Sequence, residues 1–327
     1  MYNNIYIRIA AALISLVLMV RIAPVYQHNT ALEAHEEDLP LLGRIIILDA
    51  GHGRGADNVF EGYSEHTTML ILAHRLRVHL ELLGATVHMT RSTAEDVNLF
   101  ARASYMNALA LHALQVAQIS DVRYHAENGS LTDEMILSAV SQIAEIERLL
   151  AISEQIMQKP HIYAPIYMNA PFDHSHQREI HPDMQRIFEL QDNPVIYRHF
   201  LVISLHSNAT PRPINTAANG ADVYVISNYL HSIRNYFTSW TNIERSELFA
   251  DLILDEIDKL GITRRAIRNA AFVVLREHNL PAVLVENGFH TNSRDRAKLQ
   301  CSYFISALAE GYVRAILAYF ELIEEHN

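Results

Sequence analysis

The sequence predicts an α/β fold, a mainly parallel twisted sheet with helices on both faces, carrying a mainly helical insertion. Two observations predict it. Short apolar runs rich in β-branched residues alternate with segments whose apolar residues recur at helical spacing. This alternation is typical of right-handed βαβ units, which place successive strands in one parallel sheet. Between residues 110 and 198 long helical segments interrupt the alternation, and we interpret them as an insertion.

The first part of the pattern covers residues 44–118. "RIIILDA" (44–50) is a continuous apolar run, as expected for a strand buried on both faces. A helix follows from Glu65 and ends at Gly84, a residue type favoured just after a helix. Residues 85–90 then form a second strand, and residues 98–118 a second helix.

The remaining elements lie in the insertion and after it. Within the insertion, residues 130–159 are expected to form one long helix capped by Thr132, and Pro182 opens a short helix. After it, four apolar runs are predicted to be strands and three amphipathic segments to be helices. We place the strands at 199–205, 221–227, 271–275 and 282–288, and the helices at 244–260, 293–299 and 303–323.

Composition narrows the class of protein. A chain of 327 residues, half of them hydrophobic, can bury a substantial core. Its net charge of −11 argues against nucleic-acid binding, which requires a basic face. Cys301 is the one cysteine in the sequence, so no intrachain disulfide can form.

The N-terminus resembles a targeting segment. Residues 9–20 are apolar and lie between Arg8 and Arg21. This stretch is shorter than the ~20 residues of a comfortable membrane span and matches the apolar region of a signal peptide. We therefore predict that residues 1–22 are a cleaved signal peptide or, through residues 5–22, a retained membrane anchor, with a buried helix as the alternative. Either of the first two indicates export to the periplasm or cell envelope. Residues 23–43 are expected to be a linker, which leaves 44–327 as the folded domain.

Four polar residues lie at corresponding places in this pattern. His52 follows the first strand, Glu65 opens the first helix, His206 ends a strand and Glu286 ends another. Ligand sites of open α/β sheets form beyond the carboxyl ends of the strands, so the four side chains are expected to converge. Two imidazoles and a carboxylate are a typical catalytic zinc set, and a second carboxylate beside the metal suits a general base.

Each residue also has a simpler explanation. Glu65 could favour the helix N-terminus through the helix dipole, and His206 could be a hydrogen-bonded core histidine. His52 could belong to a turn, although turns favour Asn or Asp. Glu286 is harder to explain this way, because a carboxylate after four apolar residues is costly to bury without a partner. Taken together, the four residues favour a metal site.

The segments that hold these residues resemble, in order, the motifs of the zinc-dependent N-acetylmuramoyl-L-alanine amidases (amidase type 3 family). They are "ILDAGHGRG", "SEHTTMLILAHRL", "MTR", "ISLHSNA", "GADVYVIS" and "LPAVLVENGFHTN". The resemblance covers about residues 43–109 and 199–320. Such enzymes cleave the amide between N-acetylmuramic acid and L-alanine of the peptidoglycan stem peptide, in cell-wall remodelling or daughter-cell separation. The resemblance implies a muropeptide substrate and a Zn²⁺ cofactor.

The family motifs also imply a role for each residue. His52, Glu65 and His206 correspond to the zinc ligands, and Glu286 to the catalytic glutamate. Counting back eight residues from Ala73 of the first helix selects Glu65 rather than Glu61. Two other functions remain open: another zinc amidohydrolase of peptidoglycan, such as a carboxypeptidase or deacetylase, and a non-catalytic wall-binding domain.

The largest departure from the family pattern is the insertion at 110–198. Family members with helical inserts that cover the zinc carry them elsewhere, so the resemblance brings no regulation to this one. The insertion stays a candidate site for an activator protein.

Three further sites are weaker candidates. Arg91 and Asn208 lie close to the predicted ligands, and we consider both as substrate-binding residues. A structural role is at least as plausible for Arg91. "RRAIR" (264–268) could meet anionic wall polymer, although such a run is usually a solvated face.

Overall fold

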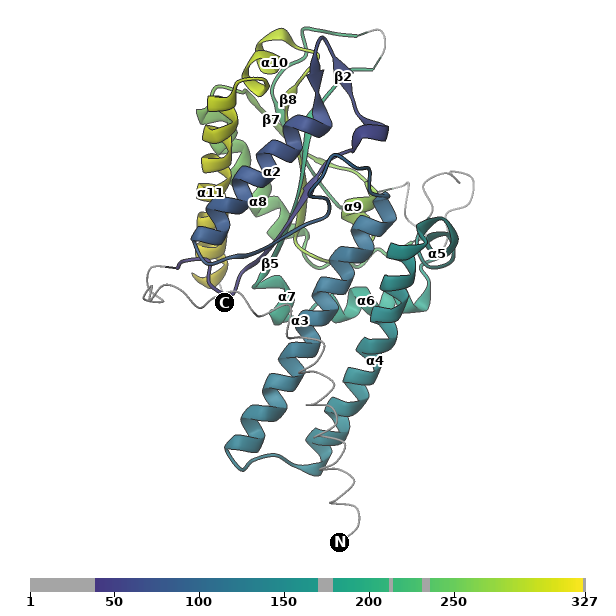
Figure 1. Cartoon of the computed structure of the whole chain (residues 1–327). Helices are drawn as coiled ribbons and strands as arrows, with labels where there is room; N and C mark the ends of the chain where they lie inside the picture. The colour runs from purple at the N-terminus through teal and green to yellow at the C-terminus, as the bar shows by residue number, and fades with distance from the viewer. Residues whose placement is uncertain (1–38, 170–178, 212–213, 231–235, 326–327) are drawn as a thin grey trace.

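A computed structural model of the chain describes residues 39–169, 179–211, 214–230 and 236–325 (Figure 1). The predicted signal peptide or anchor at 1–22 and most of the predicted linker lie outside these residues. Within the described ranges, no helix combines the length and the apolar character needed to cross a membrane.

A six-stranded sheet forms the centre of the molecule, in the order β4-β1-β5-β8-β6-β7. The strands are β1 (Ile45–Ala50), β4 (Thr86–Met89), β5 (Phe200–Asn208), β6 (Ala221–Val225), β7 (Arg264–Asn269) and β8 (Ala282–Phe289). Neighbouring strands pair in parallel except β6 with β8, which are antiparallel. The sheet is therefore mixed and mostly parallel with helices on both sides, which confirms the predicted fold class. A separate hairpin joins β2 (Val59–Phe60) to β3 (Tyr63–Ser64).

One face of the sheet is covered by three long helices, α2 (Glu65–Leu82), α8 (Ile243–Lys259) and α11 (Ser302–Glu325). The short α10 (Ser293–Leu299) precedes α11, and η2 (Arg54–Ala56) follows β1. Ser64 caps α2 by accepting a hydrogen bond from the Thr67 N–H. Gly84 follows this helix with φ of +94°, a left-handed conformation that favours glycine and confirms the predicted helix end.

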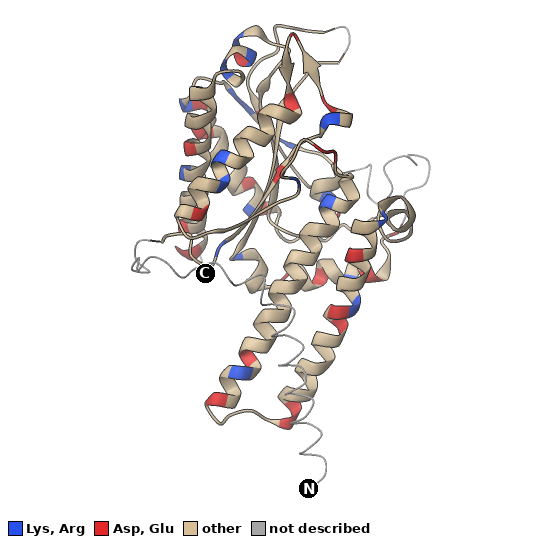
Figure 2. Cartoon of the chain, viewed as in Figure 1, with Lys and Arg blue, Asp and Glu red and all other residues tan. Residues whose placement is uncertain are grey.

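The other face carries the helices α3 (Leu99–Glu127), α4 (Asp133–Gln158), α5 (Pro160–Tyr167), α6 (Pro182–Gln191), α7 (Pro194–Tyr197) and α9 (Val273–Arg276). Figure 1 shows α3 and α4 side by side, extending past α7 on the side where β5 begins. Because the pair extends on the side where β5 begins, its tip is remote from the carboxyl ends of β1 and β5. Acidic residues lie near this tip (Figure 2).

The helices of the predicted insertion share a core with the sheet. Leu149 of α4 and Phe188 of α6 are fully buried in one cluster with Ile47 of β1 and Phe200 of β5. α3 also continues without a break through residue 110. The exact limits of the insertion remain a prediction, but its helices complete the second face of the domain.

Two sequence predictions were wrong in detail. Residues 271–275 do not form a strand, because Val273–Arg276 form the helix α9, and the strand lies earlier, at β7. A run of a few apolar residues cannot distinguish a buried strand from a buried helix. The edge strand β7 was not predicted because its arginines give it no apolar run. The helix predicted to end at residue 118 continues to Glu127. The Thr132 cap of α4 is confirmed, since its hydroxyl accepts from the Met135 N–H.

We expect Leu149→Ala to lower the free energy of unfolding by about 2–5 kcal/mol, because it opens a cavity in the shared core. Leu137→Ala is the matched control on the same helix. Leu137 is 63% exposed, whereas Leu149 is 0% exposed. Chemical denaturation of both variants would measure the difference. Equal, small effects would mean that α4 does not stabilise the domain.

Candidate functional site

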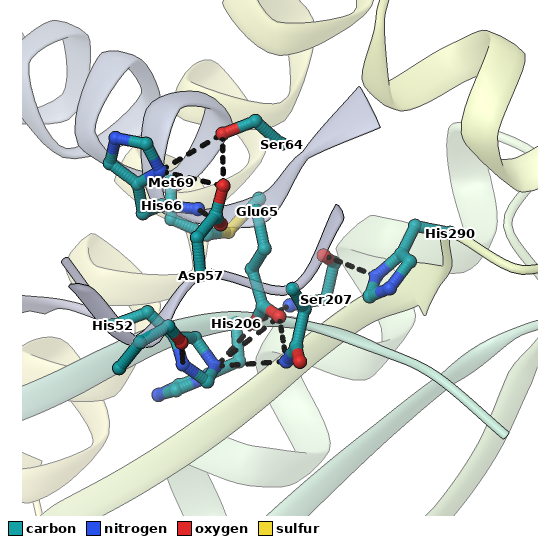
Figure 3. Close-up of polar contacts among 12 residues, drawn as sticks. His52, Asp57, Ser64, Glu65, His66, Met69, His206, Ser207 and His290 are labelled. Atoms are coloured by element: carbon teal, nitrogen blue, oxygen red, sulfur yellow. Dashed lines mark hydrogen bonds and ion pairs between the residues drawn. The ribbon is translucent and has the colours of Figure 1, made fainter. Parts of the chain in front are cut away.

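Three of the four predicted residues meet at one point, shown in Figure 3. Nε2 of His52 lies 3.3 Å from Oε2 of Glu65, and Nδ1 of His206 lies 3.0 Å from Oε1 of the same carboxylate. One nitrogen or oxygen of each residue falls within 4.8 Å of the other two. Two imidazoles and one carboxylate at this spacing could hold a metal ion, and the donor set is one that zinc commonly takes.

Glu65 enters the site from the first turn of α2 and is 1% exposed. Its Oε1 accepts from the Ser207 backbone N–H (2.9 Å), and its Oε2 from the Asn58 side-chain amide (2.7 Å). Burial alone would raise the pKa of this carboxyl, but the hydrogen bonds to His206 and His52 outweigh it and hold the pKa well below its usual range. The residue is therefore an anion. Glu61, the alternative in the sequence, pairs with Arg296 instead.

His52 has an unusual backbone conformation for a residue with a side chain. Its φ is +60°, in the left-handed region, which costs a non-glycine residue about 1 kcal/mol or more. Its Nδ1 lies 2.8 Å from the Ala56 carbonyl, so Nδ1–H donates there and Nε2 remains available as a ligand. The surrounding structure must stabilise this conformation.

Two buried arginines stabilise the left-handed conformation of His52 by donating hydrogen bonds to carbonyl groups of the turn that carries it. Arg102 of α3 donates to the carbonyls of Ala50 and His52. Arg91 donates to the carbonyls of Ala50 (2.7 Å) and Gly51 (2.7 Å), and also to the backbone of Thr93 and His66. This geometry favours the structural role for Arg91 over the predicted contact with substrate.

The glycines beside His52 make room for other residues. A Cβ on Gly51 would overlap the ring of His206, and a Cβ on Gly53 would overlap the backbone of Asp96. Neither glycine has a positive φ, so the left-handed residue of this loop is the histidine itself. The pair of glycines therefore permits close packing around His52.

Asp49, the last but one residue of β1, binds Arg102 and so holds the turn at His52 in place. It is 1% exposed and accepts from Arg102 (2.9 Å), Ser204 (2.5 Å) and Thr90 (2.5 Å). Burial alone would raise the pKa of its carboxyl, but Arg102 and the two hydroxyls have the larger, opposite effect and lower the pKa to about 2. The carboxylate thus links β1 to β5, to α3 and to the residue that follows β4.

Glu286 lies on the strand next to His206. In the register of the sheet it is the cross-strand partner of His206 on β5 and of Asp222 on β6. Its Oε2 is buried without a hydrogen-bond partner among the described residues. Burial, and then the negative charges of Glu65 and Asp222, raise the pKa of this carboxyl well above its usual range. The Glu286 carboxyl therefore has a higher affinity for a proton than an exposed glutamate.

A second set of residues supports the candidate ligands, and the sequence did not predict it. Tyr63 donates to Ser207 Oγ (2.8 Å), which lies 3.0 Å from Nδ1 of His290. The Tyr63 and His290 rings stack with centroids 5.1 Å apart. These contacts fix Ser207, whose N–H binds Glu65. The three residues are far apart in the sequence, so no local pattern could have identified them.

Asn287, the residue after Glu286, also supports the site. It is fully buried, and its side-chain amide donates to the His206 carbonyl (3.0 Å) and accepts from the Tyr312 hydroxyl (2.8 Å). It thereby ties the end of β5 to α11. Asn208 is only partly buried at the end of β5, where its carbonyl accepts from the His290 N–H. Its predicted contact with substrate stays a prediction.

A comparison with known families matches residues 46–116 and 168–318 to the Amidase_3 model, described as N-acetylmuramoyl-L-alanine amidase. The residues between the two matched stretches include all of α4 and α5.

Among curated proteins, the chain is 40% identical over 75 residues to the N-acetylmuramoyl-L-alanine amidase CwlM of Bacillus licheniformis, covering 23% of this chain and 30% of the relative. It is 23% identical over 233 residues to AmiA of Salmonella typhimurium, covering 61% and 72%. The chain thus matches less than two fifths of the length of the first curated relatives. Among solved structures, Ami1 of Mycobacterium smegmatis shares the fold, with a TM-score of 0.50, 17% identity, and coverage of 86% and 98%.

Gly51→Ala should weaken metal binding at least tenfold, because the added methyl group displaces the His206 ring from its place beside Glu65. Gly55→Ala is the control. A Cβ on Gly55 comes no closer than 3.6 Å to Asp96, an ordinary contact. Competition with a chromophoric chelator measures both affinities. An unchanged affinity in Gly51→Ala would contradict the packing argument.

Asp49→Asn should destabilise the protein by about 2 kcal/mol at neutral pH. The pKa of Asp49 is about 2 in the folded protein, below the ~3.9 of an unfolded chain. Its contribution is therefore complete above pH ~4 and is lost as the pH falls from ~4 towards ~2. Denaturant titrations of both proteins should show a difference at pH 7 that narrows across this window. A constant difference from pH 7 to pH 2 would rule out this carboxylate as its source.

Proposed function

The chain belongs to the N-acetylmuramoyl-L-alanine amidase family, and we propose that it hydrolyses the amide between N-acetylmuramic acid and L-alanine of the peptidoglycan stem, with zinc as its metal. The observation that carries this proposal is the meeting of His52, Glu65 and His206 beside a buried Glu286 oxygen that has no hydrogen-bond partner in the described part of the chain. Since the family model covers most of the chain, the amidase reaction is preferred among the reactions that such a site supports.

The three proposed ligands fit zinc in chemistry as well as in number. They are two imidazoles and one ionised carboxylate, and His52 Nδ1 is hydrogen-bonded to a carbonyl, which fixes the ring for binding through Nε2. When bound, zinc supplies a Lewis acid that polarises the scissile carbonyl and lowers the pKa of water. Arg102 and Arg91 hold the backbone around His52 in place, and the Ser207 N–H holds the Glu65 carboxylate. Both contacts reduce reorganisation during the reaction.

Glu286 is the proposed general base and acid. A proton leaves the attacking water as its oxygen forms a bond to the carbonyl carbon, and the carboxylate of Glu286 accepts it. The raised pKa of this carboxyl lets it keep the proton until the C–N bond breaks, when the alanine nitrogen takes it. The products are the lactyl carboxylate of the sugar and the free amine of the stem peptide.

Other functions predict different products. A carboxypeptidase would release the terminal alanine of the stem, a deacetylase would release acetate, and a wall-binding domain would release nothing. Mass spectrometry of a muropeptide digest distinguishes all four outcomes. We also propose export to the periplasm or cell envelope, supported by the apolar N-terminal residues 9–20 and by the location of the substrate.

An activator acting on residues 110–198 remains part of the proposal. The His52 and His206 side chains are 24% and 16% exposed, so the described helices do not cover the site completely. Deleting the whole insertion would remove Leu149 and Phe188 and expose Ile47 and Phe200 in the same core cluster, so the test uses the intact chain. Full activity of the purified chain alone would show that no activator is needed.

Glu286→Gln should retain zinc but cleave purified peptidoglycan about 10²- to 10⁴-fold more slowly, because it removes the proton acceptor. Glu321→Gln on the exposed face of α11 is the control and should match the unmodified protein. Zinc content by elemental analysis and release of free stem peptide by mass spectrometry give the two readouts. Wild-type cleavage by Glu286→Gln would assign the proton transfer to another residue.

A further inference from the structure

Two arginines of the edge strand β7 bind one buried carboxylate. The Nε atoms of Arg265 and Arg268 lie 2.9 Å and 2.8 Å from the two oxygens of Asp222 on β6. The Asp222 side chain is 2% exposed, whereas the arginines are 34% and 43% exposed. We call these three residues the Asp222 cluster. Because it contains two guanidinium groups and one carboxylate, the Asp222 cluster has a net positive charge.

The cluster lies in line with the proposed catalytic residues. Asp222 is the cross-strand partner of Glu286, and Glu286 is the partner of His206. Paired residues of adjacent strands point to the same face, and adjacent strands lie ~4.8 Å apart. The cluster is therefore about 10 Å from His206, on the far side of Glu286.

The arginines keep hydrogen-bonding capacity for a ligand. Arg268 uses only Nε, so its two Nη groups have no hydrogen-bond partner among the described residues. Arg265 donates through Nη1 to the Asn219 carbonyl and lies over the Phe289 ring, 5.1 Å from its centroid. Asp222 thus holds both guanidinium groups by one edge. Their other edges can donate to an anion, and a planar carboxylate matches that geometry.

We propose that the Asp222 cluster binds a free carboxylate of the peptidoglycan stem peptide, on the leaving-group side of the scissile amide. This inference rests on the proposed amidase function. The glycan side offers no such group, since the lactyl carboxyl is in the scissile amide, whereas the stem peptide carries free carboxylates. A stem residue spans at most ~3.5 Å along the chain, so two residues together with the carboxylate group of the second bridge the ~10 Å from His206.

The test compares two muropeptides that differ only in this carboxylate, one with a free acid at the second stem residue and one with a primary amide there. The wild-type enzyme should cleave the acid with a KM about tenfold lower than the amide. Arg268→Gln should raise the KM for the acid about tenfold with little change in kcat, and should remove the preference. For the amide, it should behave like the wild type.

Arg264→Gln is the matched control, with the same substitution in the same strand. Arg264 pairs with Asp251 and Asp255 of α8, away from the cluster. It should leave both KM values unchanged. Thermal unfolding of all variants separates a local effect from loss of fold.

Binding of the free stem peptide, measured by calorimetry, separates this inference from the proposed function. Cleavage without a preference for the acid, or equal losses on both substrates in Arg268→Gln, would overturn the inference and leave the amidase function intact. Stem-peptide binding that depends on Arg268 but without cleavage would support the cluster and refute the amidase function. If the chain neither cleaved peptidoglycan nor bound the stem peptide, the inference and the amidase function would both be refuted.

Discussion

The buried ion pair between Asp49 and Arg102 is the contact on which the geometry of the site depends. Arg102 belongs to α3 and Asp49 to β1, and both side chains are almost fully buried. Because the same guanidinium binds the carbonyls of Ala50 and His52, the pair fixes the turn that carries the first proposed ligand. Removing either partner would leave a buried charge uncompensated, which is far more costly than losing a surface ion pair. The site therefore inherits its rigidity from the core.

This contact also explains why α3 is integral to the domain. α3 supplies Arg102 near its beginning, and further along it packs with α4 and α6 over the second face of the sheet. Residues outside the family match, such as Leu149, thus share a core with strands that carry the site. A family member could gain such helices only together with the apolar positions that they cover.

The meeting of the proposed ligands was predictable from the sequence, but their supports were not. His52, His206 and Glu286 follow or end apolar runs, and the carboxyl ends of parallel strands share one edge of a sheet. The supports are hydrogen bonds between residues distant in sequence, such as Tyr63 with Ser207, or Asn287 with Tyr312. Side-chain identity alone does not reveal such pairs. Arg91 shows the limit, because its position suggested substrate while its contacts are with backbone.

The direction of β6 also explains how the site is divided. Because β6 runs antiparallel to β8, Asp222 lies near the start of β6, whereas His206 and Glu286 lie near the ends of β5 and β8. The segments that set these two sides are therefore different stretches of chain. Lengthening or exchanging the connection before β6 would change what the far side accommodates without moving His52, Glu65 or His206. Under the proposed function, such a division would let substrate preference change while the proposed metal ligands are retained.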